Sequence, residues 1–393
     1  MAGMALALGG GGAKGIFQVG AWQAFRELGI EFDAVAGTSI GAVNAGLMCG
    51  ASFDDAIKMW ENLKMEQCLA FSQIQSLNSD DLLSLRNLNL LARELLHEKK
   101  LSTRPLRELL ERYISETAVR ESPLQCGVMT TLTPSLRGYP VWIQDMAEGR
   151  LIDYIMASAR LPGLDPVEID GQQFLDGGLA EHVPVSMLRS RGWRRIVAID
   201  LNEKPTSARE VDDNTQLIYI HDPEDLGGFL DITPGILQRN LRLGYLDTLK
   251  AFDRLKGDRF AFWPDDYARL LRDFGYETVA GLEQAGAIYE LDRLVIYDHV
   301  NFIEAIRQKR ANYQMLYQQK RAALRIEHKL QAIRRGELKM LHLMPPLRLA
   351  FLMEILIEGK QQQETPRLPP RLFSSIRSAA DALMLLPDEL RNL

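Results

Sequence analysis

The chain has 393 residues, of which 46% are hydrophobic and 25% are charged, and its formal net charge is -6 at pH 7. This composition excludes a disordered, collagen-like or disulfide-stabilised chain, and the length predicts about two domains. The negative net charge provides no basic field over the whole chain, so nucleic acid is not an expected partner.

The cysteines and the apolar segments bear on location. The three cysteines are an odd number without metal-ligand or redox spacing, which favours reduced thiols in a cytosol. Met1–Leu8 is apolar but lacks a basic start and is too short for a secretion signal. The most apolar later stretch, Leu347–Ile357, is interrupted by charges. We therefore expect a cytoplasmic protein whose contact with the inner membrane face, if any, is peripheral.

In the first half, short apolar strands alternate with helical patterns, which favours a parallel sheet flanked by helices. The predicted strands are Met4–Leu8, Phe32–Ala36, Cys126–Thr131, Pro140–Gln144, Arg195–Asp200 and Leu217–Ile220. The predicted helices are Ile16–Leu28, which Gly29 ends, Ile40–Met48, and most of Leu82–Ser115. The predicted fold class is α/β, a three-layer sandwich around a central, mostly parallel sheet.

Beyond Pro223 the pattern becomes helical, with predicted helices at Pro234–Leu255, Asp266–Phe274 and Asn301–Arg335. Gln361–Arg371 is rich in glutamine and proline, which indicates an extended linker. We therefore predict a catalytic α/β domain over residues 1–222, a helical C-terminal region over 223–360, and a linker with a terminal helix over 361–393.

One segment of the helical region is strongly basic. Residues 307–339 contain ten Lys or Arg against two acids, with apolar residues at helical spacing. A basic amphipathic helix can lie on anionic lipid, which makes peripheral membrane contact one interpretation. The other, which we favour, is a packing helix with a solvated basic face.

The strongest local motif is the G-x-S-x-G sequence Gly37–Gly41, placed between a predicted strand and a predicted helix. In a nucleophile elbow the turn is so tight that its neighbours must be small, and it exposes the serine hydroxyl at the end of the strand. The context therefore indicates Ser39 as a nucleophile, whereas the pentapeptide alone also occurs in purely structural turns.

The glycine run Gly9–Gly15 also follows a strand and precedes a helix. Acyl transfer needs backbone N–H groups close to the oxyanion, and glycines allow that approach. The run is not a Walker A loop, because its lysine follows alanine and precedes glycine. It does match the dinucleotide pattern G-x-G-x-x-G, with Asp33 at a suitable distance for a ribose contact. However, Asp33 lies near the start of the second strand, and a dinucleotide site leaves Ser39 unexplained.

Asp176 follows a short apolar strand and precedes two glycines. A carboxylate on such a turn can face the end of a neighbouring strand. By itself the pattern favours an ordinary turn aspartate that bonds its own backbone.

Taken together, these blocks resemble the patatin-like phospholipase family, from Leu8 to Ile220. The resemblance includes GGGGAKG, GTSIGA, the stretch Ala157–Gly163 followed by Pro166-Val167, and FLDGGL ending in Val183-Pro184-Val185. It implies that Ser39 is the nucleophile, that Asp176 is its dyad partner, and that Gly10, Gly11 and Gly12 form the oxyanion loop. Lys14 occupies the family's Lys/Arg position, with a structural role or a solvated one equally open. Glu181-His182 departs from the family pattern, which leaves the rim beside Asp176 open to difference.

The resemblance implies catalysis without a histidine, a metal or a cofactor. Asp176 would take the Ser39 proton and return it to the leaving alcohol, and an apolar cleft would raise its pKa from about 3.9. Of the six histidines, His97, His328 and His342 lie in charged helical sequence, whereas His182, His221 and His299 are the remaining candidates. His182 is near Asp176 in sequence and could line the pocket.

The sequence therefore predicts a serine hydrolase that cleaves acyl esters of phospholipids, lysophospholipids or other lipids through an acyl-enzyme. The alternatives are a non-catalytic lipid-binding or regulatory module on the same scaffold, and a dinucleotide-binding protein. The intact Ser39, Asp176 and glycine run argue against the first alternative, and the position of Asp33 and the unexplained Ser39 argue against the second.

Overall fold

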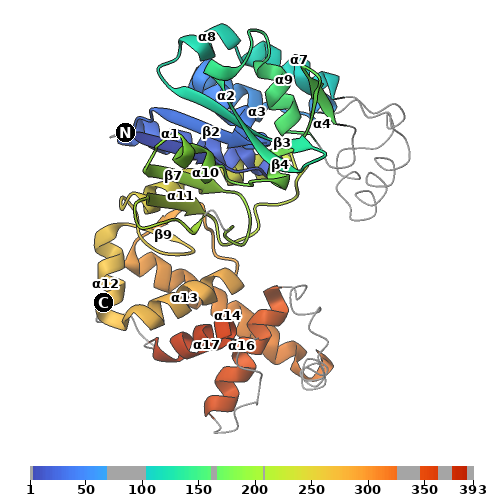
Figure 1. Ribbon diagram of the computed structural model, residues 1–393. Helices are drawn as coiled ribbons and strands as arrows, with labels where there is room; N and C mark the ends of the chain where they lie inside the picture. The colour runs from blue at the N-terminus through green and yellow to red at the C-terminus, as the bar shows by residue number, and fades with distance from the viewer. Residues whose placement is uncertain are drawn as a thin grey trace. The chain divides into compact units, whose positions relative to one another are not determined.

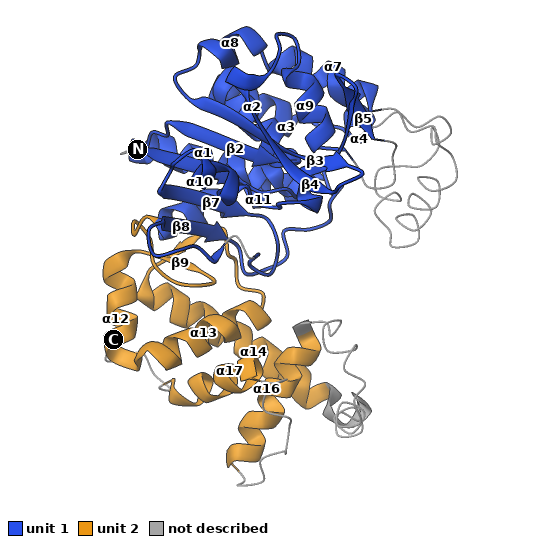
Figure 2. Cartoon of the chain, in the orientation of Figure 1, with its two compact units in different colours: residues 1–251 blue, residues 252–393 orange. Residues whose placement is uncertain are grey.

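The computed structural model describes residues 3–68, 103–160, 166–206, 209–324, 346–361 and 374–386. These residues form two compact units, Met1–Ala251 and Phe252–Leu393 (Figure 2). Among the described residues, no helix combines the length and the apolar character needed to cross a bilayer.

The first unit is built on a β-sheet flanked by helices (Figure 1). The sheet has eight strands in the order β5-β6-β3-β2-β1-β7-β8, with β4 also paired to β3. The strands are β1 (Met4–Leu8), β2 (Ala34–Thr38), β3 (Gln125–Thr133), β4 (Arg137–Trp142), β5 (Val167–Ile169), β6 (Gln172–Leu175), β7 (Arg195–Asp200) and β8 (Gln216–His221). The pairs β1–β2, β1–β7, β2–β3 and β7–β8 are parallel, whereas β4, β5 and β6 pair antiparallel. The predicted mostly parallel α/β sheet is therefore confirmed.

Helices cover both faces of this sheet. They are α1 (Ile16–Leu28), α2 (Ile40–Gly50), α3 (Phe53–Glu61), α4 (Met65–Cys68), α7 (Arg104–Tyr113), α8 (Glu116–Glu121), α9 (Leu151–Ser158), α10 (Val185–Ser190) and α11 (Pro234–Ala251), with 3-10 helices η1 (Gly12–Gly15), η2 (Ile143–Asp145) and η3 (Gly177–Leu179). Alternate strand residues such as Ala5 and Ala7 pack with Val185 and Leu188 of α10 on one face. On the other face α2 contacts β1, β2 and β3.

The helix α11 belongs to the first unit because it packs closely on α1. A Cβ atom at Gly20 would lie 1.9 Å from Leu241 O, and one at Gly244 would lie 1.9 Å from Phe17 O. Only glycines at both positions allow the two backbones to meet so closely. The boundary between the two units falls at Ala251, whereas the boundary predicted from the sequence follows residue 222. That the first part is the catalytic domain remains a prediction.

The second unit is mainly helical. Its elements are β9 (Ala261–Phe262), α12 (Pro264–Phe274), α13 (Tyr276–Ile288), β10 (Ile296–Tyr297), α14 (His299–Leu324), α16 (Pro346–Gln361) and α17 (Ser374–Leu385). Its core contains the aromatic cluster of Phe260, Phe262, Tyr297 and Phe302.

Several sequence predictions fall partly outside the described residues. Among them are the helical stretch Leu82–Ser115 over residues 82–102, the basic segment over 325–339, the linker over 362–371 and the motif Ala157–Gly163 over 161–163. In the described part of the basic segment, Tyr317 is buried and its hydroxyl donates to Glu358 at 3.0 Å. This part of α14 therefore packs within its own unit, and peripheral membrane contact remains a prediction, as does a cytoplasmic location.

Candidate active site

Ser39 lies on the sharp turn between β2 and α2, as the motif predicted. Its backbone adopts φ 56° and ψ -122°, a conformation that costs free energy for a residue with a side chain. The Ser39 N–H donates to Ser158 Oγ at 2.8 Å, and the Ser158 hydroxyl donates to Met129 O at 2.6 Å. Two buried hydrogen bonds therefore hold this strained turn against β3.

The two outer glycines of the motif have a steric reason. A Cβ atom at Gly37 would lie 2.0 Å from Gly41 O, and a Cβ atom at Gly41 would lie 2.1 Å from Leu8 O. Real Cβ atoms do not approach backbone oxygen so closely. The turn can therefore form only with glycine at both positions, beside the end of β1.

Asp176 lies between β6 and η3, with its side chain directed at the turn. The Ser39 hydroxyl donates to Asp176 Oδ2 at 2.9 Å, and the Gly178 N–H donates to Oδ1 at 2.7 Å. The Thr131 hydroxyl of β3 donates to Asp176 O at 2.8 Å. Both carboxylate oxygens thus have fixed partners, and the two residues selected from distant parts of the sequence are in direct contact.

Burial raises the pKa of the Asp176 carboxyl to about 6, although hydrogen bonds from Gly178 and Ser39 act in the opposite direction. Removal from water disfavours the charged form, so the carboxylate binds a proton more strongly than aspartate in solution. The carboxylate is therefore ionised at pH 7 and is still a better base than an exposed aspartate.

The glycine run lies beside Ser39 at the end of β1. A Cβ atom at Gly10 would lie 3.3 Å from Ser39 Cβ. The Gly10 N–H donates to His182 O at 3.1 Å. Among the described residues, no acceptor is found for the N–H groups of Gly11 and Gly12. Gly12 has φ 61°, and a Cβ atom there would lie 2.2 Å from Phe229 O, so this position requires glycine.

Lys14, within the glycine run, lies near Asp225. Lys14 Nζ lies 4.0 Å from Asp225 Oδ1, with 21% of the lysine side chain exposed. The lysine is therefore mostly packed at the start of the helix. Asp33, the ribose candidate of the dinucleotide interpretation, accepts a hydrogen bond from the Met4 N–H at 2.9 Å, at the opposite end of β1 from the glycine run. Its position does not support a dinucleotide site.

The described histidines lie in different surroundings. His182 is half-buried next to the glycine run, with Nε2 3.9 Å from Asp200 Oδ1, and burial lowers its pKa. His221 ends β8. His299 belongs to the second unit, where its Nδ1 lies 2.6 Å from Asp266. His97, His328 and His342 lie outside the described residues.

Glu181, the other departure from the family pattern, stabilises the start of α10. Its carboxylate accepts hydrogen bonds from the Ser186 N–H at 2.7 Å and the Ser186 hydroxyl at 2.6 Å. Its carbonyl oxygen accepts one from Thr38 Oγ1 at 3.0 Å. The glutamate thus connects the helix α10 to the end of β2. None of these three hydrogen bonds involves Ser39 or Asp176.

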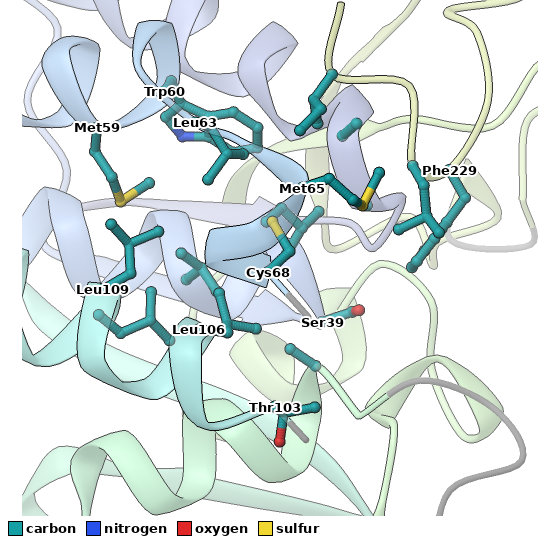
Figure 3. A pocket seen from close by; sticks show the side chains of 18 residues that line it. Ser39, Met59, Trp60, Leu63, Met65, Cys68, Thr103, Leu106, Leu109 and Phe229 are labelled. Atoms are coloured by element: carbon teal, nitrogen blue, oxygen red, sulfur yellow. The ribbon is translucent and has the colours of Figure 1, made fainter. Parts of the chain in front are cut away.

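An apolar pocket opens at Ser39. Figure 3 shows the labelled side chains of Met59, Trp60, Leu106 and Leu109 gathered to one side of the serine. The wall comes from α2, α3, α4, α7 and the loop after β8, and includes Ile40, Val43, Met59, Trp60, Leu63, Met65, Leu106, Leu109, Leu110, Phe229, Leu230 and Ile232. An apolar cleft was expected from the sequence, but its lining was not, because that lining is assembled from segments far apart in the chain.

The match to a family model covers the part of the chain that contains Ser39 and Asp176. Residues 6–189 match the family model described as patatin-like phospholipase. This part of the chain is a patatin-like phospholipase domain. It carries the elbow, the glycine run and Asp176, whereas the loop at residues 229–232 that completes the pocket lies beyond the matched range.

The curated relatives of this chain described here share less than a third of its residues over the aligned part. An uncharacterized NTE family protein of Mycobacterium tuberculosis is 28% identical over 220 residues, which are 56% of this chain and 54% of that protein. Lysophospholipase NTE1 of Saccharomyces cerevisiae is 27% identical over 266 residues, which are 64% of this chain and 14% of the yeast protein. The chain therefore spans about half, or much less, of these relatives. Among solved structures, VipD from Legionella pneumophila matches with 16% identity and a TM-score of 0.43, over 97% of this chain and 88% of VipD.

Proposed function

We propose that this chain hydrolyses fatty acyl esters of lipids, with Ser39 as nucleophile and Asp176 as its acid/base partner. The observation that carries the proposal is the 2.9 Å hydrogen bond from the Ser39 hydroxyl to Asp176, at one end of an apolar pocket. A base must reach the proton that it removes, and this pair meets that condition.

The reaction begins when Asp176 removes the proton of Ser39 Oγ as this oxygen attacks the ester carbonyl. A bond forms between Oγ and the carbonyl carbon, and the carbonyl oxygen becomes an oxyanion. When the tetrahedral intermediate collapses, the bond to the alcohol oxygen breaks, and Asp176 returns its proton to that oxygen. The product is an acyl group on Ser39 and a free alcohol.

Hydrolysis of the acyl-enzyme repeats these steps with water. Asp176 takes a proton from the water molecule while the water oxygen attacks the acyl carbon. Asp176 then returns this proton to Ser39 Oγ as the bond from Oγ to the acyl carbon breaks and the fatty acid leaves. The carboxylate ends in its starting state. The raised pKa of Asp176 supports this double role, because a base with a pKa of about 6 both accepts and releases a proton readily near neutral pH.

The backbone N–H groups of the glycine run stabilise the oxyanion in this proposal. The family resemblance implied Gly10, Gly11 and Gly12 as donors, and the structure favours a smaller set. The Gly10 N–H donates to His182 O in this structure, so Gly11 and Gly12 are the stronger candidates. Removal of one such donor reduces kcat by roughly 10²–10³ in a well-studied serine protease.

The substrate class follows from the pocket, which is lined mainly by apolar side chains next to the nucleophile. A fatty acyl chain buried there gains about 25 cal/mol per Å² of apolar surface removed from water. The relative named lysophospholipase NTE1 supports phospholipids or lysophospholipids as the lipid.

The proposal is tested by measuring release of fatty acid from lysophospholipid and phospholipid by the native chain, Ser39→Ala and Asp176→Asn. Ser135→Ala, in the exposed turn between β3 and β4, is the matched control. We expect activity in the native chain and the control, and a loss of at least about 10³-fold in both site variants. Equal rates in all four proteins would refute the proposal, and saturable lipid binding without turnover would favour a non-catalytic lipid module.

A further inference from the structure

Two buried side-chain amides hold the two ends of the glycine run. Gln18 Nε2, on α1, donates to Gly9 O at 2.8 Å, and Asn44 Nδ2, on α2, donates to Gly15 O at 2.9 Å. Gln18 and Asn44 are 2% and 3% exposed. The carbonyl groups that begin and end the run are therefore fixed by groups shielded from water, while Gly10, Gly11 and Gly12 between them have no side chains that could hold them.

The two amides also bond to each other and to a tryptophan. Asn44 Nδ2 donates to Gln18 Oε1 at 2.7 Å, and the Trp60 indole N–H donates to Asn44 Oδ1 at 3.0 Å. The Trp60 side chain is fully buried within the protein and also lines the apolar pocket. A continuous hydrogen-bonded chain thus runs from the pocket wall to the glycine run.

The tryptophan and the carbonyl groups of the glycine run set the same direction for this chain. An indole nitrogen can only donate, so Asn44 presents its oxygen to Trp60 and its nitrogen to the other side. The carbonyl oxygens of Gly15 and Gly9 can only accept, so they hold the nitrogen atoms of Asn44 and Gln18 in that orientation. Without the indole N–H, the buried Asn44 oxygen loses its donor, and the restraint that Asn44 and Gln18 place on the glycine run is weakened.

We propose that Trp60, Asn44 and Gln18 are positioning residues that align the Gly11 and Gly12 amides with the oxyanion. The proposal rests on the hydrolase function proposed above and adds that one side chain, Trp60, both contacts the acyl chain and orients the oxyanion loop. Glycine has the largest backbone freedom of any residue, so an unrestrained run of glycines would spend much of its time in unproductive conformations. Preorganised donors are what make an oxyanion site effective.

The two contributions of Trp60 can be separated. Trp60→Phe keeps an aromatic ring in the pocket wall and removes the N–H donor. Gln18→Glu keeps an oxygen for Asn44 and replaces the donor to Gly9 O with a second oxygen. The matched controls are Trp22→Phe and Gln23→Glu on α1, where Trp22 packs edge-to-face on Phe53 and Gln23 bonds Glu27 at an exposed position.

The experiment measures kcat and KM for butyryl and palmitoyl esters, and the rate at which a fluorophosphonate labels Ser39. For Trp60→Phe and Gln18→Glu we expect kcat to fall about tenfold or more on both esters, with KM within about twofold and slower labelling, because the phosphonyl oxygen occupies the same site. The controls should match the native chain.

Two results would overturn the inference. One is a kcat of Trp60→Phe equal to that of Trp22→Phe; the other is a loss confined to KM for the palmitoyl ester, which would make Trp60 a pocket wall only. If Gln18→Glu does not fold, as judged by circular dichroism, Trp60→Phe decides alone. Full activity of Ser39→Ala would instead refute the hydrolase mechanism, so the two failures are distinguishable.

Discussion

Asp176→Asn should increase the stability of the first unit at pH 8 while it abolishes activity. Burial raises the pKa of this carboxyl to about 6, which means that the folded state disfavours its charge. Asparagine has nearly the same shape, can accept the hydrogen bond from the Gly178 N–H, and carries no charge. The substitution therefore removes the free-energy cost of burying a charged carboxylate, which the native chain tolerates at its proposed reactive group.

The magnitude and the pH window follow from the shift. A rise from 3.8 to about 6 corresponds to about 3 kcal/mol, at about 1.4 kcal/mol per unit. Because Asp176 is only half-buried, solvent screening reduces the expected gain to about 1–2 kcal/mol. The folded state binds its proton more tightly than the unfolded state, so the cost is absent below about pH 4, grows as the pH rises to 6, and is constant above that. The gain at pH 5 should be about half the gain at pH 8.

Urea unfolding followed by tryptophan fluorescence provides the assay, since Trp22, Trp60, Trp142 and Trp193 lie in the first unit and only Trp263 lies in the second. Asp200→Asn is a control for which we expect the opposite change in the free energy of unfolding. Burial acts to raise the pKa of Asp200, but hydrogen bonds from Tyr219, Asn202 and Thr206 outweigh it and lower the pKa, so loss of that charge should destabilise the fold at pH 8. An Asp176→Asn variant less stable than the native chain at pH 8, or a gain that does not change with pH, would refute the reasoning.

Three further predictions concern activity. The plot of log kcat/KM against pH should fall with unit slope below about pH 6, because protonated Asp176 cannot accept the serine proton; a flat profile down to pH 4.5 would contradict this. Ser158→Ala should reduce kcat about tenfold with little change in KM, because the Ser39 N–H loses its buried acceptor, and a native rate from the variant would exclude this role. Leu106→Phe should narrow the pocket and reduce kcat/KM about tenfold for palmitoyl esters but not for butyryl esters; equal effects on both would show that the acyl chain lies elsewhere.

The local sequence pattern predicted most of the sheet and the two glycine-marked turns. Arg195–Asp200 and Met4–Leu8 were predicted with the bounds that the structure has, because short apolar runs next to glycine or charge leave little choice. The second strand begins two residues later than predicted, at Ala34, and the Asp33 side chain before it accepts a hydrogen bond from the Met4 N–H.

Features that depend on distant contacts were beyond the sequence pattern. Nothing in the local sequence indicates that the Gly10 N–H donates to His182 O, or that Gly20 and Gly244 allow α11 to pack closely on α1. The pairing of Ser39 with Asp176 was expected only through the family resemblance, since 137 residues separate the two positions. The pocket likewise depends on tertiary packing, which periodicity within one segment cannot specify.

The central claim is that the hydroxyl of Ser39 carries the acyl group during turnover. The most direct measurement is acid quenching of the protein during hydrolysis of a long-chain acyl ester, followed by mass spectrometry of its peptides. The account predicts that the peptide containing residue 39 gains the mass of the acyl group in the native chain, with none in Ser39→Ala. An acyl group on another residue, or rapid hydrolysis by Ser39→Ala, would contradict it.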